Sequence, residues 1–189
     1  MSKNLYFGLL LLIATLAQAQ TSTQSSVLSK HLLGAQVGFL GGNAYYEGRI
    51  ANQTTIRSGV NFLYIFGVSY GIDGSLYHSV LPSISAEPRY YFNANKRASE
   101  GRNTRNNAAD YFSLSFNYFP KSLIMGSDVN TTTYSVVSIV PNFGMRRNLS
   151  RNVNFEFRLG LGFATENFEN FAPVPNIGLK LGYDFLSKI

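Results

Sequence analysis

The chain has 189 residues, a length typical of a single domain, and 16 Lys and Arg against 10 Asp and Glu give a formal net charge of +6. It contains no Cys, which excludes disulfides and thiolate chemistry. Downstream of the N-terminal segment there is no apolar run long enough for a transmembrane helix. The 15 Phe, 12 Tyr and 17 Gly indicate β-structure, because aromatic side chains favour half-buried strand surfaces.

The N-terminal segment is typical of a secretory signal peptide. A positive charge at Lys3 precedes an apolar stretch, and an A-x-A cleavage motif ends at Ala19. A buried N-terminal helix is the alternative interpretation of this stretch. The expected organisation is a cleaved signal peptide over residues 1–19, a flexible Ser/Thr/Gln-rich leader over 20–30, and a single barrel domain over 31–189.

Apolar and polar residues alternate along almost all of the remaining chain. Successive side chains of a strand point to opposite faces, so a two-residue period predicts strands with one apolar and one polar face. We expect a tight hairpin turn at Gly41-Gly42 and bulges at Pro88 and Pro141, because proline removes a ladder donor. Eight strands are predicted, over residues 33–39, 44–50, 56–69, 83–92, 112–118, 137–146, 153–163 and 176–185.

The alternation has two interpretations, which differ in the face that lies inside. Apolar residues fill the interior of a soluble lipocalin-like barrel, whereas in an outer-membrane barrel they face lipid and polar residues fill the lumen. An eight-stranded barrel has an interior that side chains only just fill. The apolar face is too rich in Phe and Tyr for that space, and the polar face alternates Gly and Ser with a few charges. This composition favours the membrane barrel.

The charges on the polar face are nearly balanced. Charges inside a confined lumen must be paired, so we expect a network of ion pairs across it. The alternative is that they are solvated charges on the surface of a soluble sheet. The predicted lumen network consists of Glu47, Glu87, Glu156 and Asp184 with Arg49, Arg57, Arg89, Arg158 and Lys180.

The signal peptide, the successive hairpins, the lumen charges and a closing strand ending at Phe185 resemble the small eight-stranded outer-membrane barrels of the OmpA/OmpX type. Residues 87–93 (EPRYYFN), Lys96-Arg97 and residues 141–147 are similar to a group of uncharacterised small barrel proteins from Bacteroidota. The resemblance implies an all-β, eight-stranded antiparallel up-and-down transmembrane β-barrel in the outer membrane of a Gram-negative bacterium. It also implies outer-membrane lipid and the barrel-assembly machinery as partners. One departure is that residues 186–189 follow Phe185, whereas the usual closing strand ends on an aromatic residue.

An even number of strands places both termini at one end of the barrel, which by analogy is the periplasmic end. The connections at 51–53, 94–108 and 148–151 then lie at this end, and the Gly41-Gly42 turn and the loops at 70–79, 120–132 and 165–175 lie at the outer end. Cations at the periplasmic end would sit beside anionic lipid headgroups, and a solvated basic turn is the alternative. With seven or nine strands, residues 94–108 would instead lie outside. The predicted basic rim consists of Lys96, Arg97, Arg102, Arg105, Arg146, Arg147 and Arg151.

Few residues indicate catalysis. His31 and His78 belong to no cluster with metal-ligand spacing, so neither a metal nor another cofactor is expected. His78 lies with Ser75 and Ser79 in the predicted 70–79 loop, where a Ser–His pair is an alternative to the commoner solvated histidine. The basic residues lack interleaved aromatics, and export removes the partner, so nucleic-acid binding is disfavoured.

The sequence therefore predicts a non-enzymatic small outer-membrane barrel with a structural or surface-interaction role and an extracellular ligand that it does not identify. One alternative is a soluble exported lipocalin-like barrel that binds a hydrophobic ligand. Further alternatives are a narrow gated pore, in which the paired charges rearrange, and an outer-membrane lipid-modifying enzyme.

Overall fold

A computed structural model describes residues 27–68, 76–121, 125–126, 135–166 and 168–188. The predicted signal peptide lies outside the described residues. The strands are β1 (His31–Gly38), β2 (Gly41–Ala51), β3 (Thr54–Val68), β4 (Leu76–Tyr90), β5 (Asp110–Phe119), β6 (Met125–Gly126), β7 (Val136–Asn148), β8 (Val153–Thr165) and β9 (Ala172–Lys188). Between β4 and β5 lie the helix α2 (Ala94–Ser99) and the 3-10 turn η1 (Arg105–Asn107).

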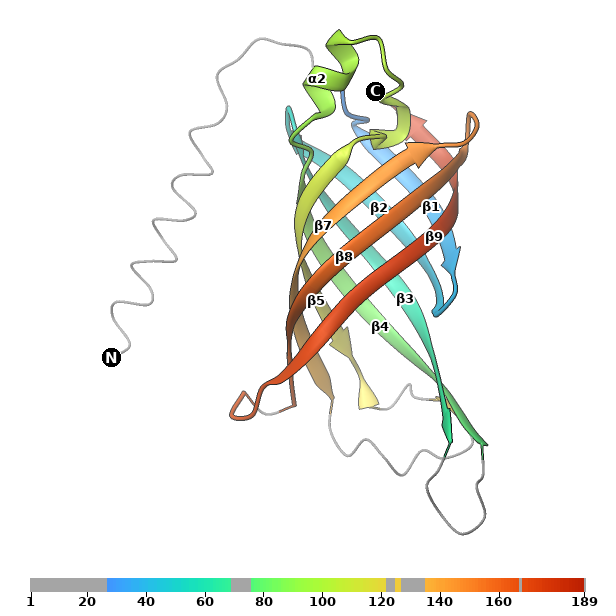
Figure 1. Ribbon diagram of the computed structural model, residues 1–189, viewed down its shortest axis with the longest axis vertical. Coiled ribbons are helices and arrows are strands. Elements are labelled where there is room, and N and C mark those ends of the chain that lie inside the picture. The colour runs from blue at the N-terminus through green and yellow to red at the C-terminus, as the bar shows by residue number, and fades with distance from the viewer. Residues whose placement is uncertain (1–26, 69–75, 122–124, 127–134, 167, 189) are drawn as a thin grey trace, which may run out of the picture.

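Eight of these strands form a closed antiparallel barrel (Figure 1). The pairing order is β3-β2-β1-β9-β8-β7-β5-β4, and the pairing of β3 with β4 closes the ring. The two-residue strand β6 pairs only with Ser79 and Val80 of β4 and lies outside the ring. The predicted eight-stranded antiparallel barrel is therefore confirmed. No helix in the described part of the chain is long and apolar enough to cross a membrane.

The barrel is polar inside and apolar outside. Glu47, Arg89 and Arg146 are almost completely buried, whereas Ile177 and Leu161 are 67% and 65% exposed. The same reversal runs along every long strand, because the two faces alternate with a period of two. The exposed apolar residues include Phe62, Ile84, Phe112, Phe116, Ile139, Phe143, Leu159, Phe163, Leu179, Leu181 and Phe185.

Strand ends differ from the sequence prediction at several places. Gly38 pairs with Gly41, so the hairpin turn lies at Phe39-Leu40 and not at Gly41-Gly42. Gly41 has φ +129°, and a Cβ there would clash with the Phe62 carbonyl oxygen, so this strand position requires glycine. β4 begins at Leu76, inside the predicted 70–79 loop. The last strand continues past Phe185 to Lys188.

Neither mid-strand proline produces a bulge. The β4–β5 ladder is interrupted at Pro88, and the β7–β8 ladder at Pro141, but the register is the same on both sides of each interruption. Each proline therefore leaves a gap in one ladder and keeps its pairing with the other neighbour, Ile56 and Leu114 respectively.

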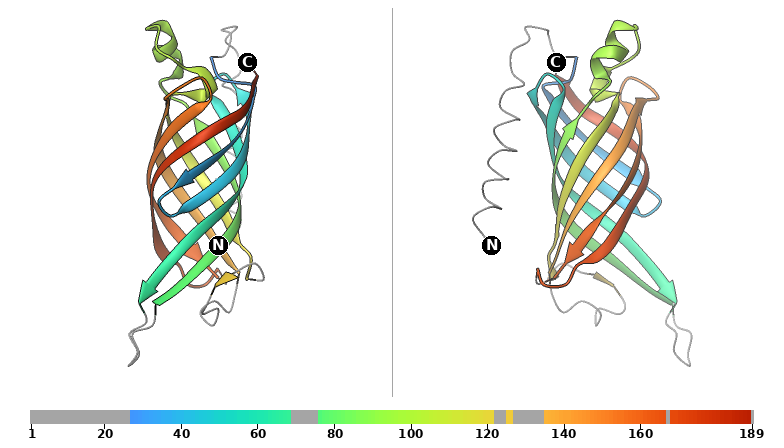
Figure 2. Two further views of the ribbon diagram at one scale, coloured as in Figure 1. Left: turned by 90° about the vertical axis from the view of Figure 1, so that its right-hand side faces the viewer. Right: turned by 60° about the vertical axis from the view of Figure 1, so that its left-hand side comes forward.

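The wall of the barrel is incomplete beside the β1–β2 hairpin. β1 pairs with β9 only as far as Gly38 and Lys180, and β2 pairs with β3 only as far as Gly41 and Leu63. Both outer neighbours continue past the hairpin, β9 back to Ala172 and β3 on to Val68. Figure 2 shows the short blue hairpin ending above the far ends of β3 and β4. We call the region between residues 172–179 and residues 64–68 the notch.

The connection at 94–108 was predicted to be hydrophilic and without helical period, but it contains both α2 and η1 and folds against one end of the barrel (Figure 1). A small apolar cluster holds it there, made by Leu28, Tyr91, Ala94, Ala109 and Tyr111, all buried. Ser29 links this connection to the end of β9, since Ser29 N donates to Asn107 Oδ1 and the Ser29 hydroxyl hydrogen-bonds the Ser187 hydroxyl. One end of the barrel is therefore covered, and the notch lies toward the other.

Candidate functional site

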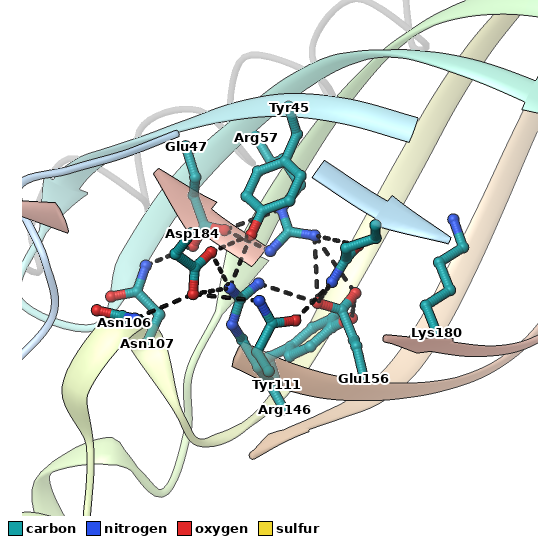
Figure 3. Close-up of polar contacts among 12 residues, drawn as sticks. Tyr45, Glu47, Arg57, Asn106, Asn107, Tyr111, Arg146, Glu156, Lys180 and Asp184 are labelled. Carbon is teal, nitrogen blue, oxygen red and sulfur yellow. Dashed lines mark hydrogen bonds and ion pairs between the residues drawn. The ribbon is translucent and has the colours of Figure 1, made fainter. Parts of the chain in front are cut away.

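Glu156, on β8, is the centre of the charged interior (Figure 3). Its carboxylate lies within 3.1–3.3 Å of four guanidinium groups, those of Arg57, Arg89, Arg146 and Arg158. These arginines come from β3, β4, β7 and β8, so one carboxylate connects opposite walls of the barrel. Such a group is stable inside a protein only because every charge has close partners.

The other interior carboxylates complete the pairing. Each lies within ion-pair distance of at least one of the same arginines, so four carboxylates face four guanidinium groups. We call these eight residues the interior network. The pairs are Glu47 with Arg57 (2.8 Å), Glu87 with Arg89 (2.8 Å) and with Arg158 (3.1 Å), and Asp184 with Arg146 (2.7 Å).

Three buried tyrosines extend the interior network. Each hydroxyl donates to a carboxylate, and two of the rings lie under guanidinium groups, with Arg57 Cζ 3.9 Å from the Tyr45 ring and Arg89 Cζ 4.3 Å from the Tyr111 ring. All three follow the polar alternation of their strands, which is the sequence signal that identifies them. The hydroxyl bonds are Tyr45 to Asp184 (2.6 Å), Tyr91 to Glu47 (2.7 Å) and Tyr111 to Glu156 (2.8 Å).

The structure brings together seven of the nine residues predicted for the lumen network and adds Arg146. That arginine was predicted to lie in the basic rim, but its side chain is 0% exposed and pairs with Glu156 and Asp184. Arg146 belongs to the polar face of β7, and its side chain is buried although it lies only two residues from the end of that strand. Arg49 lies near the covered end, where it donates to the Leu28 carbonyl oxygen (2.7 Å).

Two asparagines of η1 close the covered end of the interior. Asn107 Nδ2 donates to Glu47 (2.7 Å) and its side-chain oxygen accepts from Ser29 N (2.8 Å), while Asn106 Nδ2 donates to Asp184 (3.0 Å). Their φ values are +60° and +52°, in the left-handed region that Asn tolerates better than most residues. Residues 94–108 thus supply polar partners to two network carboxylates, which the hydrophilic composition alone did not indicate.

The remaining cations predicted for the rim lie at the covered end, but they differ in exposure and in their partners. Arg147 pairs with Asp110 (2.6 Å), and Arg97 Nε donates to the Ala108 carbonyl oxygen. The pKa of Arg97 is lowered from its usual value, chiefly by partial burial and secondly by the positive charge of the nearby Arg147. The others are exposed: Lys96 and Arg102 beside Glu100 (4.0 and 3.0 Å), Arg105 and Arg151.

The half of the interior next to the notch carries mostly neutral polar groups. Asn61 donates to Ser83 and Ser85, and Asn142 donates to Ser115. A polar cavity of ≈ 20 Å³, room for about one water molecule, lies at this level. Its lining includes Lys180, whose ammonium group donates to Asn43 Oδ1 (2.8 Å).

The two histidines lie apart from the interior network. His31 Nδ1 lies 2.6 Å from the Tyr46 hydroxyl on an exposed surface. His78 and Ser79 are consecutive residues of β4, so their side chains point to opposite faces and do not form a Ser–His pair. Ser75 lies outside the described residues. Among the described residues, no group of three or more His, Asp or Glu is arranged to hold a metal ion.

No protein-family model matches this chain, and neither a curated protein nor a solved structure is significantly similar to it.

Proposed function

We propose that this protein is a small integral barrel of the outer membrane, with a structural or surface-interaction role and without enzymatic activity. The observation that carries the proposal is the reversed sidedness of the barrel, with large apolar side chains outside and ion pairs inside. An apolar surface that surrounds a barrel is unfavourable in water but suits a lipid environment. The closed ring also satisfies the backbone hydrogen bonds that a membrane would otherwise leave unpaired.

A soluble barrel with a hydrophobic ligand is less well supported. Such a barrel needs an apolar interior, whereas the interior described here contains the interior network and amide or hydroxyl groups. Its cavity is polar and holds about one water molecule, which is far smaller than a typical ligand pocket.

A narrow gated pore is also less well supported. Water and ions would have to cross the interior network, where Glu156 alone contacts four arginines. They would also have to displace Asn106 and Asn107 at the covered end. A conducting state would therefore require several buried ion pairs to separate at once.

Fractionation and heat modifiability test the membrane assignment. We expect the protein in the outer-membrane fraction after carbonate washing, and we expect faster gel migration without boiling than after boiling. Recovery in the soluble periplasmic fraction would overturn the proposal.

Single cysteines test the orientation, because the native chain has none. Ser99→Cys lies in α2 at the covered end, and Phe171→Cys lies beyond the far end of β8, both at exposed positions. On intact cells, we expect a membrane-impermeant maleimide to label Phe171→Cys and to leave Ser99→Cys unlabelled until the outer membrane is opened. The opposite pattern would reverse the orientation while leaving the membrane assignment in place.

A further inference from the structure

Among the described residues, Lys180 is a cation of the barrel interior that forms no ion pair. Glu156 faces it across the β8–β9 ladder, but the Glu156 carboxylate is already shared by four guanidinium groups. The interior network is already balanced, with four carboxylates and four guanidinium groups in mutual contact. Lys180 Nζ donates to a neutral amide oxygen, Asn43 Oδ1, at 2.8 Å. Figure 3 shows Lys180 set apart from the cluster around Glu156. A partly buried charge without a counter-ion is unfavourable, so this position favours an anion supplied from outside the chain.

Lys180 stands where the notch begins. Gly38, its partner, is the last residue of β1, and no strand of the described part of the chain pairs with residues 172–179 of β9 on that side. At about 3.4 Å per residue, this exposes about 27 Å of strand edge. The burial of the inward-facing residues of β9 decreases toward the notch. Gly182 and Asp184 are buried, whereas Gly178 and Lys180 are partly exposed. The lumen is therefore accessible from the side at Lys180.

The two surfaces that meet at the notch have opposite character. Outside it lie the turn residues Phe39 and Leu40, which are 86% and 45% exposed, and the outward-facing Ile177 and Leu179 of β9. Inside it lies the polar cavity that Lys180 shares with Asn43, Asn61 and Arg158. A ligand that fits both surfaces has an anionic head and apolar chains.

We propose that the notch binds the phosphate-bearing headgroup of a membrane lipid, with Lys180 as its anchoring cation and the acyl chains along the Phe39-Leu40 turn and Leu179. An ammonium group provides charge-assisted hydrogen bonds to phosphate oxygens. The closed part of the cavity has room for about one water molecule, so the headgroup sits at the notch and does not enter the lumen. The proposal rests on the membrane assignment above, because a lipid would then always lie beside the notch.

A lipid titration of the full-length mature barrel, purified in a non-ionic detergent, tests this site. With native mass spectrometry as readout, we expect one dioleoylphosphatidylglycerol per barrel and no comparable binding of dioleoylglycerol, which has the same chains without phosphate. Lys180→Gln should weaken phosphatidylglycerol binding at least about tenfold, the order expected for one charge-assisted hydrogen bond. Lys188→Gln is the control for the loss of one lysine charge, since Lys188 is an exposed residue of the same strand that pairs with His31 near the covered end, away from the notch.

A second variant tests whether the notch must be open, independently of the charge of Lys180. A Cβ at Gly178 would meet only Arg158 Cβ, at 3.8 Å, so Gly178→Gln is accommodated by the backbone while its side chain obstructs the notch two residues from Lys180. We expect it to weaken lipid binding with Lys180 intact. Unchanged binding in both Lys180→Gln and Gly178→Gln would overturn the proposal, as would equal binding of dioleoylglycerol.

Competition with inorganic phosphate is the third test. If phosphate displaced the lipid at an equal concentration, the site would be a simple anion site and the lipid assignment would be wrong. A heat-modifiable, detergent-soluble barrel that binds no phosphatidylglycerol would refute only this inference. A protein that stays folded and monomeric without detergent would instead refute the membrane assignment.

Discussion

Glu156→Gln is the most direct test of the interior network. The substitution keeps the size of the side chain and removes one negative charge from a group that is 2% exposed. Four guanidinium groups would then face three carboxylates, and Tyr111 and Gln36 would lose a charged acceptor. Side chains fill the centre of the lumen, so the excess positive charge would remain buried.

The expected loss is about 3–5 kcal/mol in the free energy of unfolding, the range for removing one partner of a buried ion pair. This is a large part of the roughly 5–15 kcal/mol that typically stabilises a folded domain. Glu100→Gln is the control, because Glu100 pairs with Arg102 at an exposed position of the covered end. We expect its effect to stay below about 1 kcal/mol.

The measurement is urea unfolding in detergent micelles, followed by far-UV circular dichroism because the chain has no Trp. Adding Arg158→Gln to Glu156→Gln removes the guanidinium group whose side chain is the most exposed of the four, at 16%, and restores the charge balance. We expect the double variant to recover part of the lost stability, which a double-mutant cycle would report as a coupling energy. A Glu156→Gln loss no larger than that of Glu100→Gln would refute the view that these ion pairs hold the lumen together.

Three further changes test other parts of the structure. Arg146→Leu should lower the free energy of unfolding by about 3–5 kcal/mol in the same assay. Arg147→Leu, at the partly exposed neighbouring position, should lower it by about 1 kcal/mol or less. Equal losses would place Arg146 in the rim. Asn107→Ala should lower stability by about 1–3 kcal/mol, because Glu47 loses a buried donor, and an unchanged thermal midpoint would contradict the closure of the covered end. Leu159→Arg, at the outward-facing middle residue of β8, should reduce insertion into phosphatidylcholine vesicles by about 2–4 kcal/mol, the cost of a cation near the bilayer midplane, and normal insertion would count against a lipid-facing β8.

The strands and their sides were predictable because both follow from a period of two. Each long strand keeps one apolar and one polar face, and the limited volume of an eight-stranded interior assigns the polar face to the inside. The same alternation places Tyr45, Tyr111 and Arg146 inside, so the interior position of these residues was predictable from the sequence. Arg146 was assigned to the rim because of its nearness to a turn, whereas its parity was the better guide.

The turns and the covered end were not predictable in the same way. Gly41-Gly42 is a typical turn sequence, but Gly41 is a strand residue that lies against the Phe62 carbonyl, and the turn itself uses the exposed apolar pair Phe39-Leu40. The positions of Asn106 and Asn107 depend on a left-handed backbone and on carboxylates far away in sequence. Neither dependence leaves a local pattern in the chain.

The pairing of β1 with β9 has a consequence for the order in which the barrel is completed. Every other pairing in the ring joins two barrel strands that follow one another in the chain. The β1–β9 pairing instead joins the first strand to the last. Asp184 arrives with β9, and it is the carboxylate that neutralises Arg146 and accepts from Asn106 and Asn154. A chain that has folded only as far as β8 would therefore hold Arg146 with an incomplete set of partners and an open sheet edge on each side. Docking of the last strand removes both defects in one step, so we expect closure to be the cooperative event that separates an assembly intermediate from the finished barrel.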